Sequence, residues 1–373
     1  MTVLELTRKL VAIPSHDDEA AAGDYLEGWL RRETDANVFR DEIGNVFART
    51  GEACGAETED RATLAFVGHH DVVAPDGTQI DGDGYALEER AGRLYGRGTA
   101  DMKGTLAAAT VAFRDVANAE IDRRDGEPAR ELVFASFVGE EVGGVGARHA
   151  IEHGFVPDYA VVGEGSTGYS GPDVTDVAVA HKGRRGSTIT AYGVSSHASE
   201  PHAGENAIYR ATDAVDLVRS LEAPAVSVAG DRLEGSVVVT EIDGGAAMNV
   251  VPDRCTITVD ERTVPGERAP LERVERIDGV EWTVDQDLPP MRCTDETFAE
   301  TVLAAASEVQ SGSPALVTKP HATDAGWLAA AGTDCVICGA AEPGEAHTED
   351  ESVSVTVLER CHEIYRSVAR RWL

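Results

Sequence analysis

Short apolar runs alternate with longer amphipathic segments in the first half of the chain and again near its end. Apolar runs of this kind are typical of buried strands, whereas one apolar face at helical spacing is typical of a surface helix. Alternating strands and helices predict an α/β fold in which helices cover both faces of a mostly parallel sheet. The predicted strands are residues 62–73, 131–139, 158–164 and 333–339, and the predicted helices are residues 101–119, 146–154, 295–310 and 356–373.

The pattern between these two regions is different. It predicts the order strand, helix, strand, strand, helix, strand, which is that of a small ferredoxin-like domain (βαββαβ). Asn206 is the expected N-cap of the first of its helices, which has an apolar face. The predicted segments are residues 186–194, 206–222, 236–245, 255–264, 268–279 and 281–286.

With 373 residues, the chain is long enough for two domains, each with its own hydrophobic core. We expect the larger domain, with the mostly parallel sheet, to comprise residues 1–181 plus 288–373. The ferredoxin-like domain is then an insertion at residues 182–287.

The chain is strongly acidic, with a formal net charge of −33 and four lysines among its 33 basic residues. This balance argues against nucleic acid or an anionic membrane surface as a partner. It favours an acidic surface suited to high salt, as in halophilic proteins, over a surface that binds a basic partner. No stretch approaches the roughly 20 apolar residues that span a bilayer. Because the N-terminal residues also lack the pattern of a signal peptide, we expect a cytoplasmic protein.

Among the six cysteines, only Cys335 and Cys338 have a suggestive spacing. They belong to the predicted strand 333–339, in which residues three apart point to opposite faces. We therefore predict buried thiols at these positions, and neither a redox pair nor a zinc clip.

Histidines and acidic residues gather where the predicted strands stop. In an α/β sheet of this type, the carboxyl ends of the strands form the ligand crevice, so residues far apart in sequence are expected to meet there. These candidates are His69, Asp71, Asp101, Glu140, Glu141, Glu164 and His347.

Imidazole and carboxylate groups without thiolates are ligands suited to zinc, cobalt or manganese. Two such ions, about 3.5–4 Å apart, need a bridging carboxylate and terminal ligands on each side. The candidates meet this requirement with one glutamate to spare, so we expect one of the adjacent Glu140 and Glu141 to bind metal and the other to take a proton from the bridging water. Asp71 is placed to accept a hydrogen bond from His69, whereas His70 points the other way and is predicted to be a packed or surface histidine.

Seven short motifs carry a resemblance that spans nearly the whole chain. "GHHDVV", "GRGTADMKG", "GEEVGGVGA", "VVGEGS", "SSHASEP", "MNVVPD" and "AHTEDES" occur in the order seen in a family of dinuclear zinc amidohydrolases and exopeptidases. That family includes acetylornithine deacetylase, succinyl-diaminopimelate desuccinylase, glutamate carboxypeptidase and aminoacylase. The resemblance implies a zinc-exopeptidase-like catalytic domain, an inserted lid and dimerisation domain, two divalent ions (Zn²⁺, with Co²⁺ or Mn²⁺ as alternatives), a small N-acyl amino acid as substrate, and a homodimer.

The resemblance also implies a role for each matching residue. Asp101 corresponds to the bridging carboxylate, Glu140 to the general base, Asp71 to the residue that orients His69, and His197 to a lid histidine that stabilises the oxyanion in the partner subunit's site. The peptide bond after Asp101 is expected to be cis. The implied terminal metal ligands are His69, Glu141, Glu164 and His347, and the implied substrate contacts are Arg184, Asn249, Arg262 and Thr323.

Three positions depart from the family pattern, and all three concern specificity. Ala74 precedes the first proline, Gly165 replaces a proline, and "HATDAG" replaces a glycine-threonine opening, which leaves Thr323 as the equivalent. Two alternatives stay open: a dipeptidase or carboxypeptidase with the same machinery, and a non-catalytic metal-binding module. A phosphate loop at residues 143–150 is disfavoured, because the acidic strand end would repel phosphate.

Overall fold

The computed structural model describes residues 1–50, 62–82, 84–119 and 130–373. Cys54, one of the six cysteines, lies outside the described residues. The chain divides into two compact units: unit 1 comprises Met1–Ala180, Arg292–Lys319 and Thr323–Leu373, and unit 2 comprises His181–Met291 and Pro320–Ala322. The two units are described separately below.

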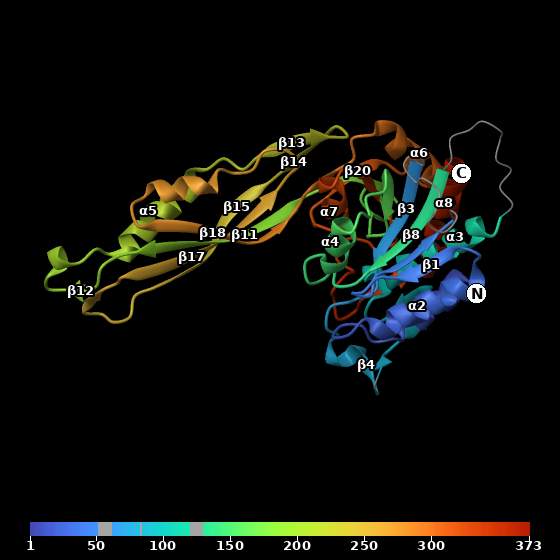
Figure 1. Cartoon of the computed structure of the whole chain (residues 1–373), viewed down its shortest axis with the longest axis horizontal. Coiled ribbons are helices and arrows are strands. Elements are labelled where there is room, and N and C mark those ends of the chain that lie inside the picture. Colours follow the sequence, from blue (N-terminus) through green and yellow to red (C-terminus); the bar gives the residue numbers. More distant parts are fainter. Residues whose placement is uncertain (51–61, 83, 120–129) are drawn as a thin grey trace. The chain divides into compact units, whose positions relative to one another are not determined.

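Unit 1 is built on a nine-stranded sheet with the order β1-β2-β8-β3-β9-β21-β10-β19, in which β20 also pairs with β10 (Figure 1). The central pairs β8/β3, β3/β9 and β9/β21 are parallel, whereas β1/β2, β2/β8 and β10/β21 are antiparallel. The predicted α/β fold with a mostly parallel sheet is confirmed. The strands are β1 (Asn37–Arg40), β2 (Val46–Arg49), β3 (Ala62–His69), β8 (Arg130–Phe137), β9 (Tyr159–Val162), β10 (Val177–His181), β19 (Met291–Arg292), β20 (Leu316–Lys319) and β21 (Asp334–Ile337).

Helices cover both faces of this sheet. On one face α3 packs on β3 and β8, and α1, α2 and α8 pack around α3, while α6 packs on α8. On the other face α4 packs on β8, and α7 packs on β9 and β21. These helices are α1 (Val3–Val11), α2 (Ala20–Glu33), α3 (Gly104–Ala117), α4 (Val145–Glu152), α6 (Glu296–Glu308), α7 (Asp324–Ala330) and α8 (Val355–Trp372).

The central strands are buried on both faces, which explains why they are continuous apolar runs in the sequence. Six of the eight residues of β3 and seven of the eight residues of β8 are buried. Because β8, β3, β9 and β21 run parallel, their carboxyl ends lie at the same edge of the sheet. The loops that follow these strands begin at that edge.

Short elements near the loop before α3 complete unit 1. β7 pairs with both β6 and β22, and β4 pairs with β5. The short elements are η2 (Gly77–Gln79), β4 (Ile80–Asp81), β5 (Gly84–Tyr85), β6 (Glu88–Arg90), β7 (Arg93–Tyr95), η3 (Thr99–Lys103) and β22 (Ser352–Ser354).

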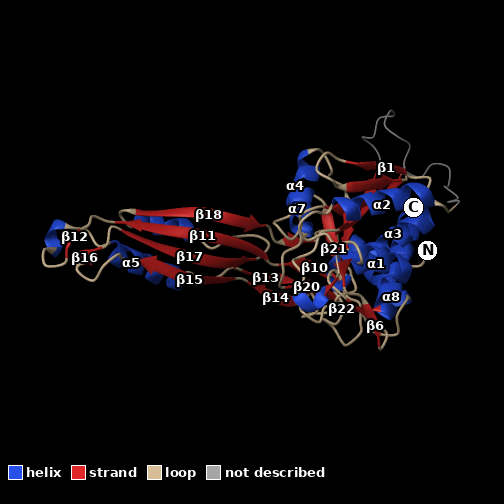
Figure 2. Cartoon of the chain, turned by 90° about the horizontal axis from the view of Figure 1, so that it is seen from below, coloured by secondary structure: helices blue, strands red, loops and turns tan. Residues whose placement is uncertain are grey.

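Unit 2 contains a four-stranded antiparallel sheet with the order β15-β17-β11-β18 (Figure 2). Along the chain the main elements follow as strand, helix, two strands, 3₁₀ helix and strand, with a β13/β14 hairpin before β15. The elements are β11 (Gly183–Tyr192), β12 (Ser196–His197), η4 (Pro201–Ala203), α5 (Ala207–Ser220), β13 (Ala225–Val228), β14 (Asp231–Glu234), β15 (Ser236–Gly244), β16 (Val250–Val251), β17 (Arg254–Thr263), η5 (Leu271–Arg276) and β18 (Val280–Leu288).

The core of unit 2 lies between this sheet and α5. The Asn206 side chain caps α5 by accepting a hydrogen bond from the Ile208 amide at 2.9 Å. Ala211 and Val218 from the predicted apolar face of α5 are fully buried against Ile257 and Val259 of β17. The predicted second helix of this region, residues 268–279, is instead the six-residue 3₁₀ helix η5. Pro270 disfavours a helical conformation of Ala269 before it, and Ile277 after it is extended with a ψ of 125°.

The cysteines at the centre of the unit 1 sheet are buried thiols. Cys335 lies within β21 and Cys338 directly after it, and both are fully buried and free. Burial raises the pKa of Cys338 to about 12, so this thiol stays protonated at neutral pH. No helix among the described residues is long and apolar enough to cross a bilayer.

Candidate metal centre

Two groups of side chains that could each hold a metal ion share Asp101. His69, Asp101 and Glu164 form one group, and Asp101, Glu141 and His347 form the other. His69 Nε2 lies 3.1 Å from Asp101 Oδ1 and 3.3 Å from Glu164 Oε1. His347 Nε2 lies 3.1 Å from Asp101 Oδ2 and 2.9 Å from Glu141 Oε1. The structure therefore brings together the five residues predicted as metal ligands, with one carboxylate oxygen of Asp101 facing each histidine.

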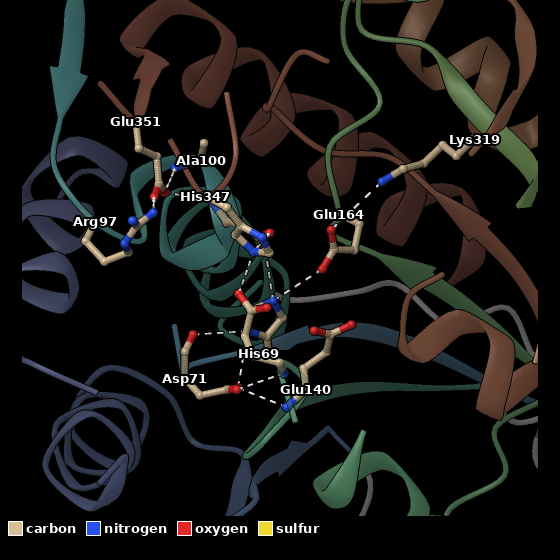
Figure 3. Close-up of polar contacts among 11 residues, drawn as sticks. His69, Asp71, Arg97, Ala100, Glu140, Glu164, Lys319, His347 and Glu351 are labelled. Atoms are coloured by element: carbon tan, nitrogen blue, oxygen red, sulfur yellow. Dashed lines mark hydrogen bonds and ion pairs between the residues drawn. The ribbon is translucent and has the colours of Figure 1, made fainter. Parts of the chain in front are cut away.

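Figure 3 shows His69, Glu164 and His347 pointing toward one another. His69 is the last residue of β3, and Glu141 and Glu164 lie in the loops after β8 and β9. His347 lies in the loop after β21 with a positive φ of 62°. The site is therefore assembled at the carboxyl ends of four neighbouring parallel strands.

Asp71 orients His69 and ties two loops together. His69 Nδ1 lies 3.1 Å from the Asp71 carbonyl oxygen and 3.2 Å from Asp71 Oδ1. A carbonyl oxygen only accepts, so Nδ1 donates to Asp71, and this contact holds the ring with Nε2 toward Asp101 and Glu164. The Asp71 carboxylate also accepts from the backbone amides of Glu140 at 3.2 Å and Glu141 at 3.0 Å. Asp71 therefore fixes the His69 ring and the position of both glutamates.

Asp101 is held from behind by Glu351. Glu351 Oε1 accepts from the amides of Ala100 at 3.0 Å and Asp101 at 3.2 Å, and its other oxygen pairs with the buried Arg97 (Figure 3). The Asp101–Met102 peptide is cis, as expected. Burial raises the pKa of Asp101, but hydrogen bonds from two imidazoles outweigh it and lower that pKa below its usual value. Asp101 is therefore ionised.

Glu140 lies beside the two groups without belonging to either. Its burial, together with the nearby Asp324, Glu164 and Asp101 carboxylates, raises its pKa well above the usual value. The loop that carries it turns at Gly144, which has a φ of 71°. A Cβ there would lie 2.5 Å from Trp327 Nε1, so only glycine fits this turn.

The electrostatics of this site favour a cation. Among the described residues, Lys319 is the only Lys or Arg within 4 Å of the Asp101, Glu140, Glu141 or Glu164 carboxylates, with Nζ 3.9 Å from Glu164. Hydrogen bonds to Asp101 and Glu141 raise the pKa of His347 to about 10. Adjacent buried carboxylates are costly unless positive charge accompanies them. The donor set of two imidazoles and three carboxylates, with a shared Asp101, fits a pair of divalent ions.

His70 is a packed histidine on the other side of β3. It is fully buried, with Nδ1 2.8 Å from Ser136 Oγ. Burial lowers the pKa of His70 to about 3, so the ring is neutral. The prediction that His70 is not a ligand agrees with this environment.

The predicted lid histidine lies in unit 2. His197 is exposed in β12, which pairs with β16, and Ala198 N donates to the Asn249 carbonyl at 2.9 Å. The Ser199 amide donates to His197 Nδ1 at 3.2 Å. Because an amide only donates, Nδ1 accepts, and the proton of the neutral ring is on Nε2. His197 is thus prepared to donate one hydrogen bond, and Asn249 is its neighbour.

The two predicted substrate arginines already share a carboxylate. Arg184 and Arg262 are directly opposite each other on β11 and β17, and the Nε of each lies 2.8 Å from an oxygen of Asp260. Thr323 lies in unit 1, where its Oγ1 caps α7 by accepting from the Ala325 amide at 3.2 Å. The structure places these three residues in structural contacts, and Asp260 partly neutralises the arginines.

Three buried residues around the site were not predicted from the sequence: Lys319, Asp324 and Glu351. Glu351 ends the acidic run "TEDE", which looks like a solvated loop, and no local pattern shows that Arg97 will meet it. Lys319 is one of four lysines and ends an apolar stretch, which is the one signal that could have drawn attention to it. Asp324 follows the α7 cap, and neither of its buried oxygens has a hydrogen-bond partner among the described residues.

The comparisons of this sequence with known proteins agree with one another. The family model "Peptidase family M20/M25/M40" matches residues 65–371. Acetylornithine deacetylase of Myxococcus xanthus is 31% identical, over 93% of this chain and 90% of that protein. Succinyl-diaminopimelate desuccinylase of Stenotrophomonas maltophilia is 28% identical, over 100% of this chain and 99% of that protein.

Solved structures share the fold. Aminopeptidase PepT from Bacillus cereus has a TM-score of 0.78 at 22% identity and covers 99% of this chain and 97% of its own. A Bacillus subtilis protein described as a dinuclear metal binding peptidase from the M20 family has a TM-score of 0.68 at 15% identity, with 99% and 97% covered.

Proposed function

Since the chain belongs to peptidase family M20/M25/M40, we propose that it uses two divalent metal ions to hydrolyse the amide bond of an N-acyl amino acid. The products are a carboxylate and a free amino acid. The observation that carries this proposal is the arrangement at Asp101, whose two oxygens lie 3.1 Å from His69 Nε2 and 3.1 Å from His347 Nε2.

The sequence relatives favour an acyl group over a peptide. The relatives that span most of this chain at 28–31% identity are named deacetylase or desuccinylase. The solved peptidases are similar in fold but less similar in sequence, at 22% identity or below for the two named above. We therefore place succinyl and acetyl amino acids first among the substrates.

Asp101 would bridge the two ions, His69 and Glu164 would complete one set of ligands, and Glu141 and His347 the other. Bound divalent ions polarise a carbonyl oxygen and lower the pKa of water near neutrality. Zn²⁺ suits this donor set, and Co²⁺ and Mn²⁺ are also compatible with it.

Glu140 would act as the general base. Burial raises its pKa above that of an ordinary glutamate, which makes it a stronger base toward a proton of water that it later gives back to the leaving amine. Asp71 holds the Glu140 and Glu141 amides, so both carboxylates stay beside His69. A non-catalytic metal-binding module would have no use for a buried base in this position.

His197 would stabilise the oxyanion that forms on the acyl carbonyl. Its Nδ1 is occupied by the Ser199 amide, which leaves Nε2–H as the donor. Four further residues would contact the acyl or carboxylate ends of the substrate. They are Asn249, which is adjacent to His197, and Arg184, Arg262 and Thr323. Because Asp260 is bonded to both arginines, the substrate carboxylate would have to share them with that side chain.

We propose a homodimer formed through unit 2, in which His197 of each subunit serves the other subunit's site. β15 lies at the edge of the four-stranded sheet, and the residues Val238 and Ile242 on it are about half exposed, at 51% and 53%. An edge strand with apolar side chains is a ready surface for a second copy of the chain. Sedimentation of an active monomer would contradict this arrangement.

The experiment is a substrate panel at high salt with zinc, cobalt and manganese. N-succinyl and N-acetyl amino acids are compared with dipeptides of the same residues, and the Glu140→Gln variant is the control for contaminating activity. We expect the acyl amino acids to have the higher kcat/KM. Preference for the dipeptides would reassign the enzyme as a peptidase, and no hydrolysis of any member would refute the proposal.

A further inference from the structure

A third group of potential metal ligands lies on the surface of unit 1, apart from the five residues above. It consists of Glu42, in the turn between β1 and β2, and of His149 and His153, which lie one helical turn apart at the end of α4. One ligand atom of each residue lies within 4.8 Å of the others. We propose that these three side chains bind a divalent transition-metal ion.

The two histidines already have the geometry of a chelating pair. Residues four apart on a helix share a face, and the ring centroids of His149 and His153 are 4.0 Å apart. His153 Nδ1 lies 2.8 Å from the His149 carbonyl oxygen, which can only accept. The proton of the neutral His153 ring is therefore on Nδ1, and the Nε2 lone pair is free for a metal ion. A second nitrogen bonded to a backbone carbonyl is the usual arrangement of a metal-binding histidine.

The carboxylates opposite the histidines are too distant for hydrogen bonds but close enough to share an ion. His149 Nε2 lies 3.8 Å from Glu42 Oε1 and 4.0 Å from Asp41 Oδ2. Two ligands of one tetrahedral zinc ion, each about 2.0–2.1 Å from it, lie roughly 3.3 Å apart. The Glu42 side chain is 78% exposed, so a small rotation closes the difference. Among the described residues, no lysine or arginine lies within 4 Å of the Glu42 carboxylate.

The backbone that carries these ligands is held in place before any ion binds. The Asp41 carboxylate accepts from the amides of Gly44 at 3.0 Å and Asn45 at 2.9 Å, which fixes the turn. Asn45 Nδ2 donates to the Gly146 carbonyl at 3.0 Å, and Val138 N donates to Asn45 Oδ1 at 3.0 Å. The turn is thus attached to the start of α4 and to the end of β8, so little ordering is needed on binding.

Two imidazoles and one carboxylate select zinc, nickel, cobalt or copper over calcium or magnesium, which prefer oxygen ligands. The site would also take an ion without closing around it, since Glu42 and His153 are exposed. The ion would link the β1–β2 turn to α4, apart from the chemistry at Asp101.

The test is a metal count by equilibrium dialysis of the full chain against ZnCl₂. The double variant His149→Ala/His153→Ala is compared with the wild type, and His202→Ala, an exposed histidine of unit 2, is the matched control. We expect the double variant to bind one zinc ion fewer than the wild type, while His202→Ala binds as many as the wild type. This difference does not depend on how many ions the Asp101 groups hold. The hydrolase activity of all three proteins is expected to be equal.

Glu42→Gln provides a second variant that leaves both histidines in place. This variant is expected to bind the same zinc ion more weakly. Added Mg²⁺ is expected to leave the number of zinc ions bound by each protein unchanged. Equal zinc counts in the wild type and the double variant would overturn the proposal. So would a loss in His202→Ala as large as in the double variant, because it would show nonspecific binding to exposed histidines.

Discussion

The candidate site residues of the two units differ in how firmly the fold holds them. In unit 1, the side chains of His69, Asp101 and Glu164 are at most 16% exposed, whereas that of His347 is 48% exposed. In unit 2, His197 and Asn249 are exposed, and the side chains of Arg184 and Arg262 are 44% and 40% exposed. The buried set is fixed by many contacts, whereas the exposed set can be changed without rebuilding a core. The buried ligand groups of unit 1 thus differ in exposure from His197 and the predicted substrate contacts of unit 2.

The largest expected effect is that of Glu140→Gln. Loss of the general base should lower kcat by about 10²–10⁴-fold, because general acid–base catalysis typically contributes that much. Metal content should stay unchanged, since Glu140 belongs to neither ligand group. The matched variant Glu141→Gln should lose metal as well as activity. The assigned roles would be contradicted if Glu140→Gln kept near-normal turnover and both variants kept a similar metal content.

The second largest expected effect is on the kcat of a unit 2 variant, and it tests whether unit 2 takes part in the reaction. His197→Ala should lower kcat by about 10²–10³-fold, the usual loss for one oxyanion donor, with metal content unchanged. His202→Ala is the control from the same unit. A kcat within a factor of about two of the wild type in His197→Ala would leave the chemistry to unit 1 alone.

A smaller effect is expected for Asp71→Asn, because this residue acts through His69. An amide in place of the carboxylate weakens the orientation of the ring and the hold on the two glutamate amides. Loss of such an indirect contact typically costs about 10–100-fold in metal affinity or activity. Metal titration of Asp71→Asn against Asp81→Asn, an exposed control, measures this loss, and equal affinities would refute it.

The last prediction concerns the stability of unit 1 and not catalysis. Burial raises the pKa of Asp324 from 3.8 to about 8, so the folded chain keeps a proton that the unfolded chain loses. Stability should therefore be highest below pH 4 on account of this group and fall as the pH rises to about 8. Asp324→Asn should remove that decline, while the exposed control Asp213→Asn should retain it. Chemical denaturation between pH 5 and pH 9 gives the comparison, and parallel curves for all three proteins would contradict it.

The sequence predicts the central part of the fold well. Strands β3, β8, β9 and β21 are apolar on both faces, so each is recognisable as a continuous run, and α3 and α8 follow the helical period. Several elements were not predicted, among them α1, α2, β1 and β2. α1 begins with a capping box formed by Thr2 and Glu5, a local signal that could have predicted it. β1, at the edge of the sheet, and its neighbour β2 have only four residues each, too few for a period to appear.

The site was predictable where residues follow a strand and was not predictable where they meet by tertiary packing. His69 and Glu164 stand directly at or after strand ends, and the strand order then brings them together. Glu351 and Arg97 are 254 positions apart and pair in the interior, which no local pattern can indicate. Lys319 reaches Glu164 only because β20 joins the sheet beside β10.

The central claim is that two ions share Asp101, and a metal count tests it most directly. The comparison uses the His149→Ala/His153→Ala protein with and without Asp101→Ala, each dialysed against ZnCl₂ and analysed for zinc per chain. The account predicts two ions in the protein that retains Asp101 and at most one after its removal. Two ions bound without Asp101, or none bound with it, would contradict the claim.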